Sequence, residues 1–418
     1  MTNSQAEARV EDDVFSAEAT WDPYGFFGRL RERAPVHFNE KYGVWLITRY
    51  DDVSGMARDP QTYSSAVWGN DTRDPWPPIP EADLPLYDRM RKVFIDWIPQ
   101  NDPPHHREMR QVFNGKFGRR DVEVWRSFVA ETTADLLAAL EEKQAAGETV
   151  DLATDFAAPL PILVVLGLLE AELDREKVLE VGRELNYFSR GDFDRMGHID
   201  NGIQMIFDMI EPLIEARRDN PGDDLISKML KAERDGVLSS NEVKANSLFF
   251  FSAGFETTMN AILNGTLAFI DHPSQWALLQ EDPDAVCARA AEEVLRYEPS
   301  LKSLHRIAAK DVELRGKLIR KGDRIRAIIS SSNRDPEFVE NPDEFNINRS
   351  PAPRHLGYGT GPHACLGAML ARVEVQEVFK AFAKNYSAVE LAVGRNELGY
   401  MPSISFRALN ELPVRLEK

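Results

Sequence analysis

The chain has 418 residues, of which 43% are hydrophobic, and its formal net charge is −18. Such an acidic chain is a poor candidate for binding nucleic acid or an anionic membrane, because both require basic protein surface. Its two cysteines, Cys287 and Cys365, lie far apart in the sequence. This count argues against a disulfide scaffold or a cysteine-rich metal site, and it fits a reducing compartment. We therefore expect a cytoplasmic protein.

The sequence gives no sign of a targeting segment or of several domains. Met1 to Asp13 is polar and acidic and lacks the pattern of a signal peptide. The longest apolar stretch, Phe156 to Leu169, is interrupted by prolines and a glycine and is too short to span a bilayer, so we interpret it as a core helix. Without repeats or linkers, residues 1–418 are expected to form a single domain in which residues 1–15 are flexible.

The predicted elements are mostly helices. In chain order, the patterns predict a strand at 43–48, helices at 121–144 and 195–218, a helix from the capping box Ser239-x-x-Glu242 to about Ile270, a helix from Pro283 to Tyr297, short strands at 312–319 and 324–329, a helix at 366–385 and a short hairpin at 404–416. The chain is thus expected to be mainly α with a small β region.

The most informative segment is the glycine-rich loop from His355 to Gly367, which contains Cys365 and precedes a predicted helix. A thiolate must be stabilised to remain an iron ligand, and a helix start offers a positive dipole end and unpaired N–H groups. Glycines let the backbone curl around the sulfur, and strong electron donation by the thiolate favours cleavage of an O–O bond. The alternative is a glycine-rich turn around a buried cysteine.

This loop resembles the haem-binding loop of the cytochrome P450 family. The family pattern, aromatic-Gly-x-Gly-x-His-x-Cys-x-Gly, is matched by Tyr358, Gly359, Gly361, His363, Cys365 and Gly367. The resemblance implies the P450 fold, a triangular helical prism that holds haem b between a long central helix and the cysteine loop, with Cys365 as the iron ligand. Tyr358 departs from the usual Phe, which could alter the redox tuning.

A second group of candidate residues is the pair Glu256 and Thr257, which interrupts the apolar stretch from Leu248 to Thr258. Burying an ionised acid is costly, so Glu256 needs a partner or a task. The Thr257 hydroxyl can bond the carbonyl of Ala253 and loosen the helix, and Gly254 leaves space beside that opening. We expect a small polar notch suited to dioxygen and a water. The alternative is a Glu256 that faces a loop or salt bridge beside a Thr257 that is merely packed.

This stretch is similar to the family signature Ala-Gly-x-(Asp/Glu)-Thr, which implies that Glu256 and Thr257 are catalytic and relay protons to dioxygen. The resemblance also implies that four cationic side chains contact the haem propionates, although each could be an ordinary surface charge: His106, Arg110, Arg306 and His363. Glu293 and Arg296, three residues apart on a helix, match the family's Glu-x-x-Arg pair and are expected to be structural.

Helical spacing places Phe249, Ser252 and Ala253 on or near the face of Thr257, toward the haem. By resemblance, Leu301, Leu304, Ser405 and Phe406 should approach the same cavity. The segment from Trp68 to Ile98, with Trp76 and Trp97, and the segment from Leu185 to Phe188 should form a mobile lid. Such an apolar lining favours a compact apolar or aromatic substrate.

The preferred function is that of a haem-thiolate monooxygenase that hydroxylates or O-dealkylates a small molecule with dioxygen. Electrons are expected from NAD(P)H through a separate reductase and a ferredoxin or flavodoxin, which would bind near Cys365, where Arg354 and Arg372 offer positive charge. One alternative is a peroxide-driven enzyme, although peroxide brings its own protons and needs no Glu256–Thr257 relay. Another is a haem-binding sensor, which would have no use for that pair.

Overall fold

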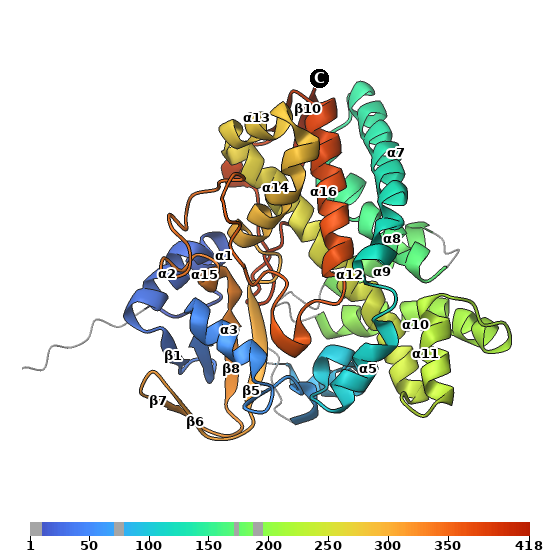
Figure 1. Cartoon of the computed structure of the whole chain (residues 1–418), viewed down its shortest axis with the longest axis vertical. Helices are drawn as coiled ribbons and strands as arrows, with labels where there is room; N and C mark the ends of the chain where they lie inside the picture. The colour runs from blue at the N-terminus through green and yellow to red at the C-terminus, as the bar shows by residue number, and fades with distance from the viewer. Residues whose placement is uncertain (1–10, 71–78, 171–174, 187–194) are drawn as a thin grey trace, which may run out of the picture.

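The computed structural model describes residues 11–70, 79–170, 175–186 and 195–418. Helices fill most of the molecule, and a smaller β region lies with the N-terminal helices at the lower left of Figure 1. The prediction of a mainly α chain with a small β region is confirmed. Most of the segment expected to be flexible, residues 1–15, lies outside the described residues.

The helices and strands have the following bounds. The helices are α1 (Ala17–Trp21), α2 (Pro23–Arg33), α3 (Tyr50–Arg58), α4 (Leu84–Phe94), α5 (His105–Phe113), α6 (Arg119–Glu123), α7 (Trp125–Ala145), α8 (Pro159–Leu168), α9 (Arg175–Asn186), α10 (Arg195–Asp219), α11 (Leu225–Arg234), α12 (Ser240–Asp271), α13 (Pro273–Glu281), α14 (Pro283–Tyr297), α15 (Ile329–Ser332) and α16 (Ala368–Asn385). The strands are β1 (Val36–Asn39), β2 (Val44–Ile47), β3 (Tyr63–Ser64), β4 (Val150–Asp151), β5 (Ser303–Ala308), β6 (Val312–Leu314), β7 (Lys317–Ile319), β8 (Arg324–Ile328), β9 (Ala388–Leu391) and β10 (Pro413–Glu417).

The largest sheet has the strand order β1-β2-β8-β5-β3, and its β2–β8 pair is parallel. Successive side chains of a strand point to opposite faces of a sheet. Along β8, Ala327 therefore packs in one cluster with Val53 and Met56 of α3, whereas Ile328 packs in another with Phe26 of α2. Helices thus cover both faces of this sheet.

The long helix α12 runs through the centre of the molecule. The predicted capping box opens it, because the hydroxyl of Ser239 accepts from the N–H of Glu242 and the Glu242 carboxylate accepts from the N–H of Ser239. Its 32 residues make it roughly 48 Å long. At Gly265, a larger side chain would collide with Phe379 of α16, so this glycine lets the two helices approach closely.

The predicted pair of Glu293 and Arg296 is buried and holds together the segment that precedes the cysteine loop. The guanidinium of Arg296 donates to both carboxylate oxygens of Glu293, at 2.7 and 2.8 Å, and Arg349 donates to the same carboxylate at 3.0 Å. Arg296 also donates to the carbonyls of Asn333, Pro342 and Glu344. A buried cation with this many acceptors fixes the backbone around it.

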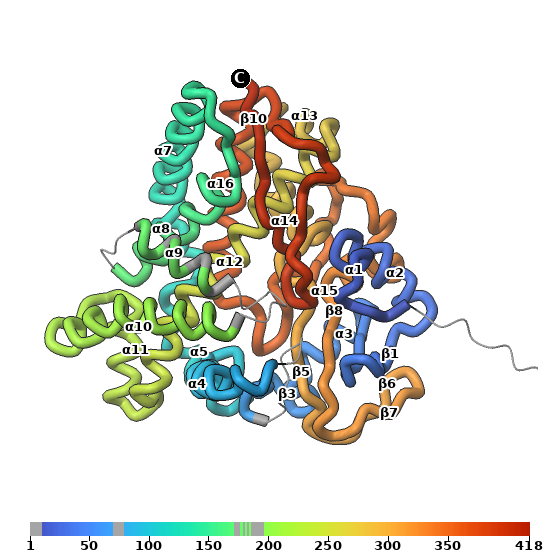
Figure 2. Tube along the Cα trace, turned by 180° about the vertical axis from the view of Figure 1, so that it is seen from behind, coloured from blue at the N-terminus to red at the C-terminus, as the bar shows by residue number. Residues whose placement is uncertain are grey.

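Three predicted elements differ from the structure. Residues 121–144 form two helices, α6 and α7, that meet at Val124. Residues 312–319 form the hairpin β6–β7, because Arg315 and Gly316 adopt positive φ and reverse the chain between them. The predicted hairpin at 404–416 is wrong, since β10 pairs with β9 and β4 instead. Figure 2 shows this C-terminal segment, in red, descending toward the β region and returning to β10.

Candidate active site

Cys365 lies between a short 3-10 turn, Gly361–His363, and the start of α16. Its backbone N–H donates to the carbonyl of Tyr358 at 2.8 Å, and the N–H of Gly367 donates to its sulfur. Gly361 has a φ of +72°, and a side chain there would collide with the carbonyl group of Ala57 in α3. Glycine therefore lets the loop turn close to α3, which fixes the position of the sulfur.

The exposed surface of Cys365 lies within a cavity between the cysteine loop and α12, which we call the thiol cavity. Its lining includes Ile98, His106, Arg110, Val165, Phe249, Ala253, Thr257, His363, Cys365, Gly367 and Glu374. Burial raises the pKa of the Cys365 thiol, and the Gly367 amide and the charges of Arg110 and Arg372 oppose that rise. A bound cation would complete the stabilisation of a thiolate.

Three cationic or imidazole side chains line one part of the thiol cavity. His106 and Arg110 lie on α5, and the ring of His106 lies 3.9 Å from that of His363, between centroids. Burial, together with Arg110, lowers the pKa of His106 to about 4, and burial together with His106 lowers the pKa of His363 to about 2. The charge of Arg306 acts on both rings. Because these side chains repel one another when they carry positive charge, a bound anionic group would stabilise the cluster.

The donors of the thiol cavity fit a haem. Nε2 of His363 is buried and has no hydrogen-bond partner within the described part of the chain, which leaves a donor position for a propionate. No group of three or more His, Cys, Asp or Glu side chains in the described ranges could hold a metal ion. A metal at Cys365 would therefore need its other ligands from a cofactor, and haem supplies four nitrogens and two carboxylates.

The opposite wall of the thiol cavity is the face of α12 that carries Ala253 and Thr257. The Thr257 hydroxyl donates to the carbonyl of Ala253 at 2.9 Å, as predicted. The helix nevertheless continues without a break through both residues. Gly254 also lines the thiol cavity, and a Cβ atom at this position would lie only 2.7 Å from Val165 of α8. This glycine thus allows the close packing of two helices.

A second cavity adjoins the same face of α12, and we call it the aromatic cavity. It is lined by Phe94, Trp97, Ile199, Leu248, Phe249, Ser252, Ala253, Phe255, Glu256, Thr257, Leu301 and Phe406. The ring centroids of Trp97 and Phe249 are 5.3 Å apart, and those of Phe94 and Trp97 are 3.9 Å apart. Because Phe249, Ala253 and Thr257 line both cavities, the aromatic cavity leads to the position opposite Cys365.

Most residues that the sequence analysis placed in the site meet at these cavities, and four do not: Tyr358, discussed below, and three others. Among the described lining residues of either cavity, Leu304, Ser405 and Arg306 are absent. Leu304 packs in the cluster of α3 and β8, and the Ser405 hydroxyl accepts from Arg326. The guanidinium of Arg306 is buried and donates to the carbonyl of His305, although its charge acts on His106 and His363. The orientations of Leu304 and Arg306 depend on the alternation of side chains along β5, and that of Ser405 depends on how its loop packs against distant strands.

Tyr358, within the cysteine loop, packs against Arg372 of α16. The guanidinium of Arg372 lies 4.2 Å from its ring centroid and also donates to Glu292 at 2.6 and 3.0 Å. Burial raises the pKa of Tyr358 well above its usual value, so its phenol stays neutral. Its hydroxyl has no partner among the described residues. A Phe in this position would keep the same ring packing.

Two functional candidates were missed. Glu374 on α16 lines the thiol cavity, is 3% exposed, and has one carboxylate oxygen without a partner in the described ranges. Its position between two apolar residues, Val373 and Val375, is the sequence feature that could have identified it as a buried acid. His105, to which no role was given, donates to Glu242 at 2.5 Å and thereby joins α5 to the start of α12. No local pattern predicts that contact.

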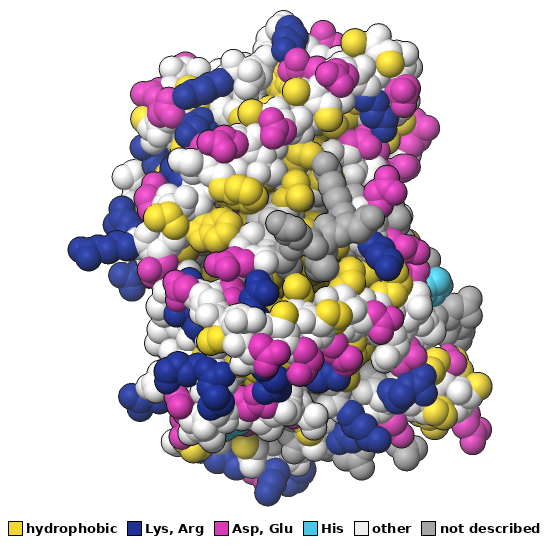
Figure 3. Space-filling model, turned by 90° about the vertical axis from the view of Figure 1, so that its right-hand side faces the viewer, with side chains coloured by type: hydrophobic (Ala, Val, Ile, Leu, Met, Phe, Trp, Pro, Cys, Tyr) yellow, Lys and Arg dark blue, Asp and Glu magenta, His cyan; other side chains and the backbone are white. Residues whose placement is uncertain are grey.

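Part of the predicted lid can be located. Trp97 lines the aromatic cavity, and Trp68 packs against Phe94 with centroids 5.7 Å apart. Trp76 and residues 187–188 lie outside the described residues. Figure 3 shows a face on which side chains of both charge signs are interspersed and apolar side chains gather at mid-height.

Comparison with known proteins identifies the family. The family model named Cytochrome P450 matches residues 95–393. The chain belongs to the cytochrome P450 family. It is similar to the polyketide biosynthesis cytochrome P450 PksS of Bacillus subtilis, with 34% identity over 95% of this chain and 96% of that protein. It is also similar to the 6-deoxyerythronolide B hydroxylase of Saccharopolyspora erythraea, with 32% identity over 98% of each chain.

Solved structures show the same fold for this P450. CalO2 superposes with a TM-score of 0.85 and 30% identity, over 98% of this chain and 99% of that one. P450BioI, solved with an acyl carrier protein that carries hexadec-9Z-enoic acid, superposes with a TM-score of 0.84 and 30% identity, over 96% of this chain and all of that one. The P450 fold and monooxygenase activity follow, with haem as the cofactor. Within the ranges that the structure describes, no helix combines the length and the hydropathy of a membrane-spanning segment.

Proposed function

We propose that this P450 hydroxylates or O-dealkylates a compact apolar or aromatic small molecule in the cytoplasm, using haem b. The observation that carries the proposal is the lining of the aromatic cavity, which is dominated by Phe94, Trp97, Phe249, Leu301 and Phe406 and leads to the position opposite Cys365. Because such a lining offers few polar groups, the substrate would be oriented by its shape and by aromatic contacts.

The residues of the thiol cavity have distinct roles in this proposal. Cys365 would ligate the iron as a thiolate that accepts a hydrogen bond from the N–H of Gly367. His106, Arg110 and His363 would bind the propionates, and the charge of Arg306 would add to theirs. The haem would supply the site that binds and activates dioxygen. Ala253 would pack against the cofactor, and Tyr358 would buttress the loop through Arg372.

On the α12 wall, Glu256 and Thr257 would deliver protons. The Thr257 hydroxyl donates to Ala253 at 2.9 Å, so its oxygen is held with lone pairs free to accept from a water in the cavity. Glu256 faces the aromatic cavity one residue away and would exchange protons with that water. Phe249, Ser252 and Ala253 would hold the substrate beside this pair, whereas Leu304 and Ser405 would act only through neighbouring residues.

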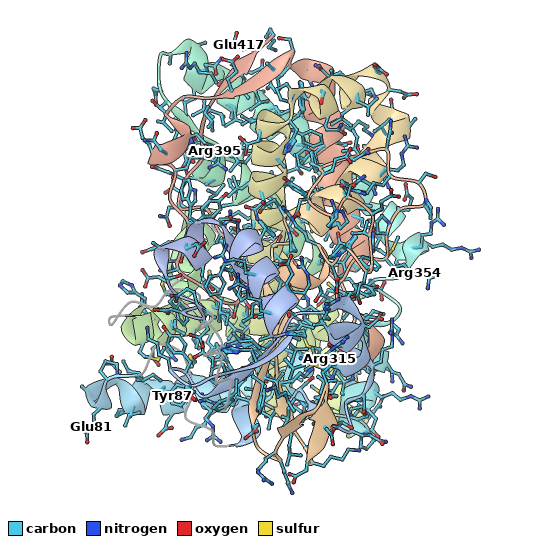
Figure 4. All side chains as sticks on the ribbon, turned by 90° about the vertical axis from the view of Figure 1, so that its left-hand side faces the viewer. Glu81, Tyr87, Arg315, Arg354, Arg395 and Glu417 are labelled. Atoms are coloured by element: carbon cyan, nitrogen blue, oxygen red, sulfur yellow. The ribbon has the colours of Figure 1, made fainter. Side chains whose placement is uncertain are left out.

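Electrons would come from NAD(P)H through a reductase and a ferredoxin or flavodoxin that docks on the surface near Cys365. Arg354 is exposed there and lies at the edge of the molecule in Figure 4. The guanidinium of Arg372 is held by Glu292, so Arg354 is the better candidate for a docking charge.

The test combines binding and turnover. Aromatic acids, phenols, terpenes and macrolides are titrated into the holoenzyme, and binders are found by the shift of the haem spin state. Because one relative is named for polyketide biosynthesis and one similar structure holds an acyl carrier protein, polyketides and carrier-linked acyl chains belong in the same screen. A binder should be oxidised with NADH and a ferredoxin system; turnover with peroxide alone would favour the peroxide-driven alternative.

A further inference from the structure

One face of α12 carries a file of buried polar side chains beyond Thr257. Asn260 and Asn264 follow at three and seven residues, and residues three or four apart are neighbours on a helix surface. Asn260 is 0% exposed, and neither its amide nitrogen nor its amide oxygen has a hydrogen-bond partner in the described part of the chain. Asn264 is 2% exposed and donates to the carbonyl of Arg407 at 2.9 Å, but its oxygen also has no partner there.

The file ends at a third cavity, which we call the polar cavity. In contrast to the aromatic cavity, it is lined by charged and polar groups that include Asn264, Asp271, Glu298, Arg334, Arg395 and Arg407. Arg395 is exposed and is labelled in Figure 4, so the polar cavity lies close to solvent. At 1.5 Å per residue, Asn264 lies about 10 Å along the helix from Thr257, and Asn260 lies between them.

The segment that faces this file is also polar. The hydroxyl of Ser300 donates to the carbonyl of Thr257 at 2.7 Å, and the N–H of Arg407 donates to the carbonyl of Ser300 at 2.8 Å. Lys302, two residues further on, is 2% exposed, and the charges of Arg407 and Glu298 act on it. Polar groups therefore lie at both ends of the file, with Ser300 at Thr257 and Arg407 at the polar cavity.

A fully buried amide with no protein partner is rare, because each unmade hydrogen bond costs the desolvation of that group. Such groups usually bind internal waters, which need a polar site with two to four partners. The amide oxygen and nitrogen of Asn260, the oxygen of Asn264 and the hydroxyl of Thr257 provide such partners along one face.

We propose that Asn260 and Asn264 are positioning residues that hold a file of buried waters, which supplies protons from the polar cavity to Thr257. The inference rests on the proposed function, in which Thr257 passes protons on, and it adds a second entry for them besides Glu256. Each water accepts one proton from its neighbour on the side of the polar cavity and releases one toward Thr257. The amides do not titrate, and as the Thr257 hydroxyl accepts a proton from the last water it releases its own toward the thiol cavity, so that the net change is one proton moved from solvent to that cavity.

The first test is a high-resolution crystal structure of the wild-type holoenzyme. Ordered waters are expected within hydrogen-bond distance of both polar atoms of Asn260, with further waters linking it to Asn264 and to Thr257. A dry Asn260, or an amide that finds protein partners instead, overturns the proposal. This readout does not depend on turnover.

The second test uses variants with a matched control. Asn260→Leu should reduce product formation at least threefold and raise its kinetic solvent isotope effect, because proton delivery becomes slower, while Asn260→Ser, which can still bind a water, recovers most of the rate. Thr266 is the control: it lies nine residues after Thr257, half a turn round the helix, is 3% exposed, and its hydroxyl has no partner in the described ranges. Thr266→Val should behave as the wild type.

The outcomes separate the two proposals. An unchanged rate and isotope effect in Asn260→Leu, or an equal loss in Thr266→Val, overturns the water file. If Asn260→Leu does not fold, Asn264→Leu is measured in its place and must show the same loss. Failure of the wild type to couple NADH oxidation to product contradicts the proposed function, whereas the crystallographic waters still decide whether the file exists.

Discussion

The two walls of the thiol cavity are built in opposite ways. The cysteine loop is irregular backbone, in which Gly359 and Gly361 adopt positive φ, the amide of Gly367 donates to the sulfur, and cations gather nearby. The α12 wall is part of a regular helix, on which Thr257 and Glu256 interrupt an apolar stretch. Tuning electron donation thus requires a backbone shaped around one atom, whereas proton delivery requires a few hydroxyls, acids and waters placed on a rigid surface.

The largest expected effect comes from removing the sulfur. Cys365→Ala should abolish the strongly red-shifted Soret band of the reduced carbon-monoxide complex and all product formation, because no thiolate remains to ligate the iron. The measurement is the reduced carbon-monoxide difference spectrum of the purified variant. Survival of that band would show that another residue is the ligand. Cys287→Ala, in the other cysteine, is the control and should keep the band, since Cys287 is a buried core residue of α14.

A smaller effect is expected on the opposite wall. Thr257→Ala should keep the spectrum of the thiolate-ligated haem but lower the product formed per NADH by at least about tenfold, with the missing electrons recovered as peroxide. Thr257→Ser keeps the hydroxyl and should retain most of the coupling. The ratio of product to NADH consumed is measured with any substrate found by the binding screen. Unchanged coupling in Thr257→Ala would contradict the relay.

The same contrast explains what the sequence could predict. The cysteine loop, the capping box at Ser239 and the bond from Thr257 to Ala253 depend on residues close in sequence, and the structure shows all three. Other features depend on how distant strands and loops pack. These are the positions of Leu304 and Ser405 and the strand pairing of residues 404–416. Periodicity describes one element at a time, so it cannot settle such contacts.

A third prediction concerns Glu374, the buried acid on the cysteine side. Burial raises its pKa to about 8, so it stays protonated in the folded protein at a pH where the unfolded chain has released the proton. Stability should therefore fall as pH rises from about 4.5 toward 8, by up to about 1.4 kcal/mol per pH unit from this group. Glu374→Gln removes this dependence and should gain stability relative to the wild type at pH 8 but not at pH 4.5.

The measurement is denaturant unfolding of both proteins in the haem-loaded form across this pH range. Glu377, on the same helix, provides the matched control, because its carboxylate is equally buried but is paired with Arg126 and Lys380. Glu377→Gln should lose stability, since it leaves two cations without their partner. A pH profile of Glu374→Gln parallel to that of the wild type would show that Glu374 is ionised in the folded protein.

The smallest expected effect concerns the contact that joins α5 to α12. His105 lies on α5 beside His106, which faces the cations of the cysteine side, and its ring donates to Glu242 in the first turn of α12. The hydrogen bond to Glu242 raises the pKa of His105. The stabilisation of the folded protein by this hydrogen bond is thus fully present below about pH 6.5, and it is lost as pH rises through the higher pKa that His105 has in the folded state. Because the ring is 37% exposed, His105→Gln should cost less than about 1 kcal/mol at pH 6 and still less at pH 9, by denaturant unfolding. An equal cost at both pH values would mean that packing, rather than charge, ties α5 to α12.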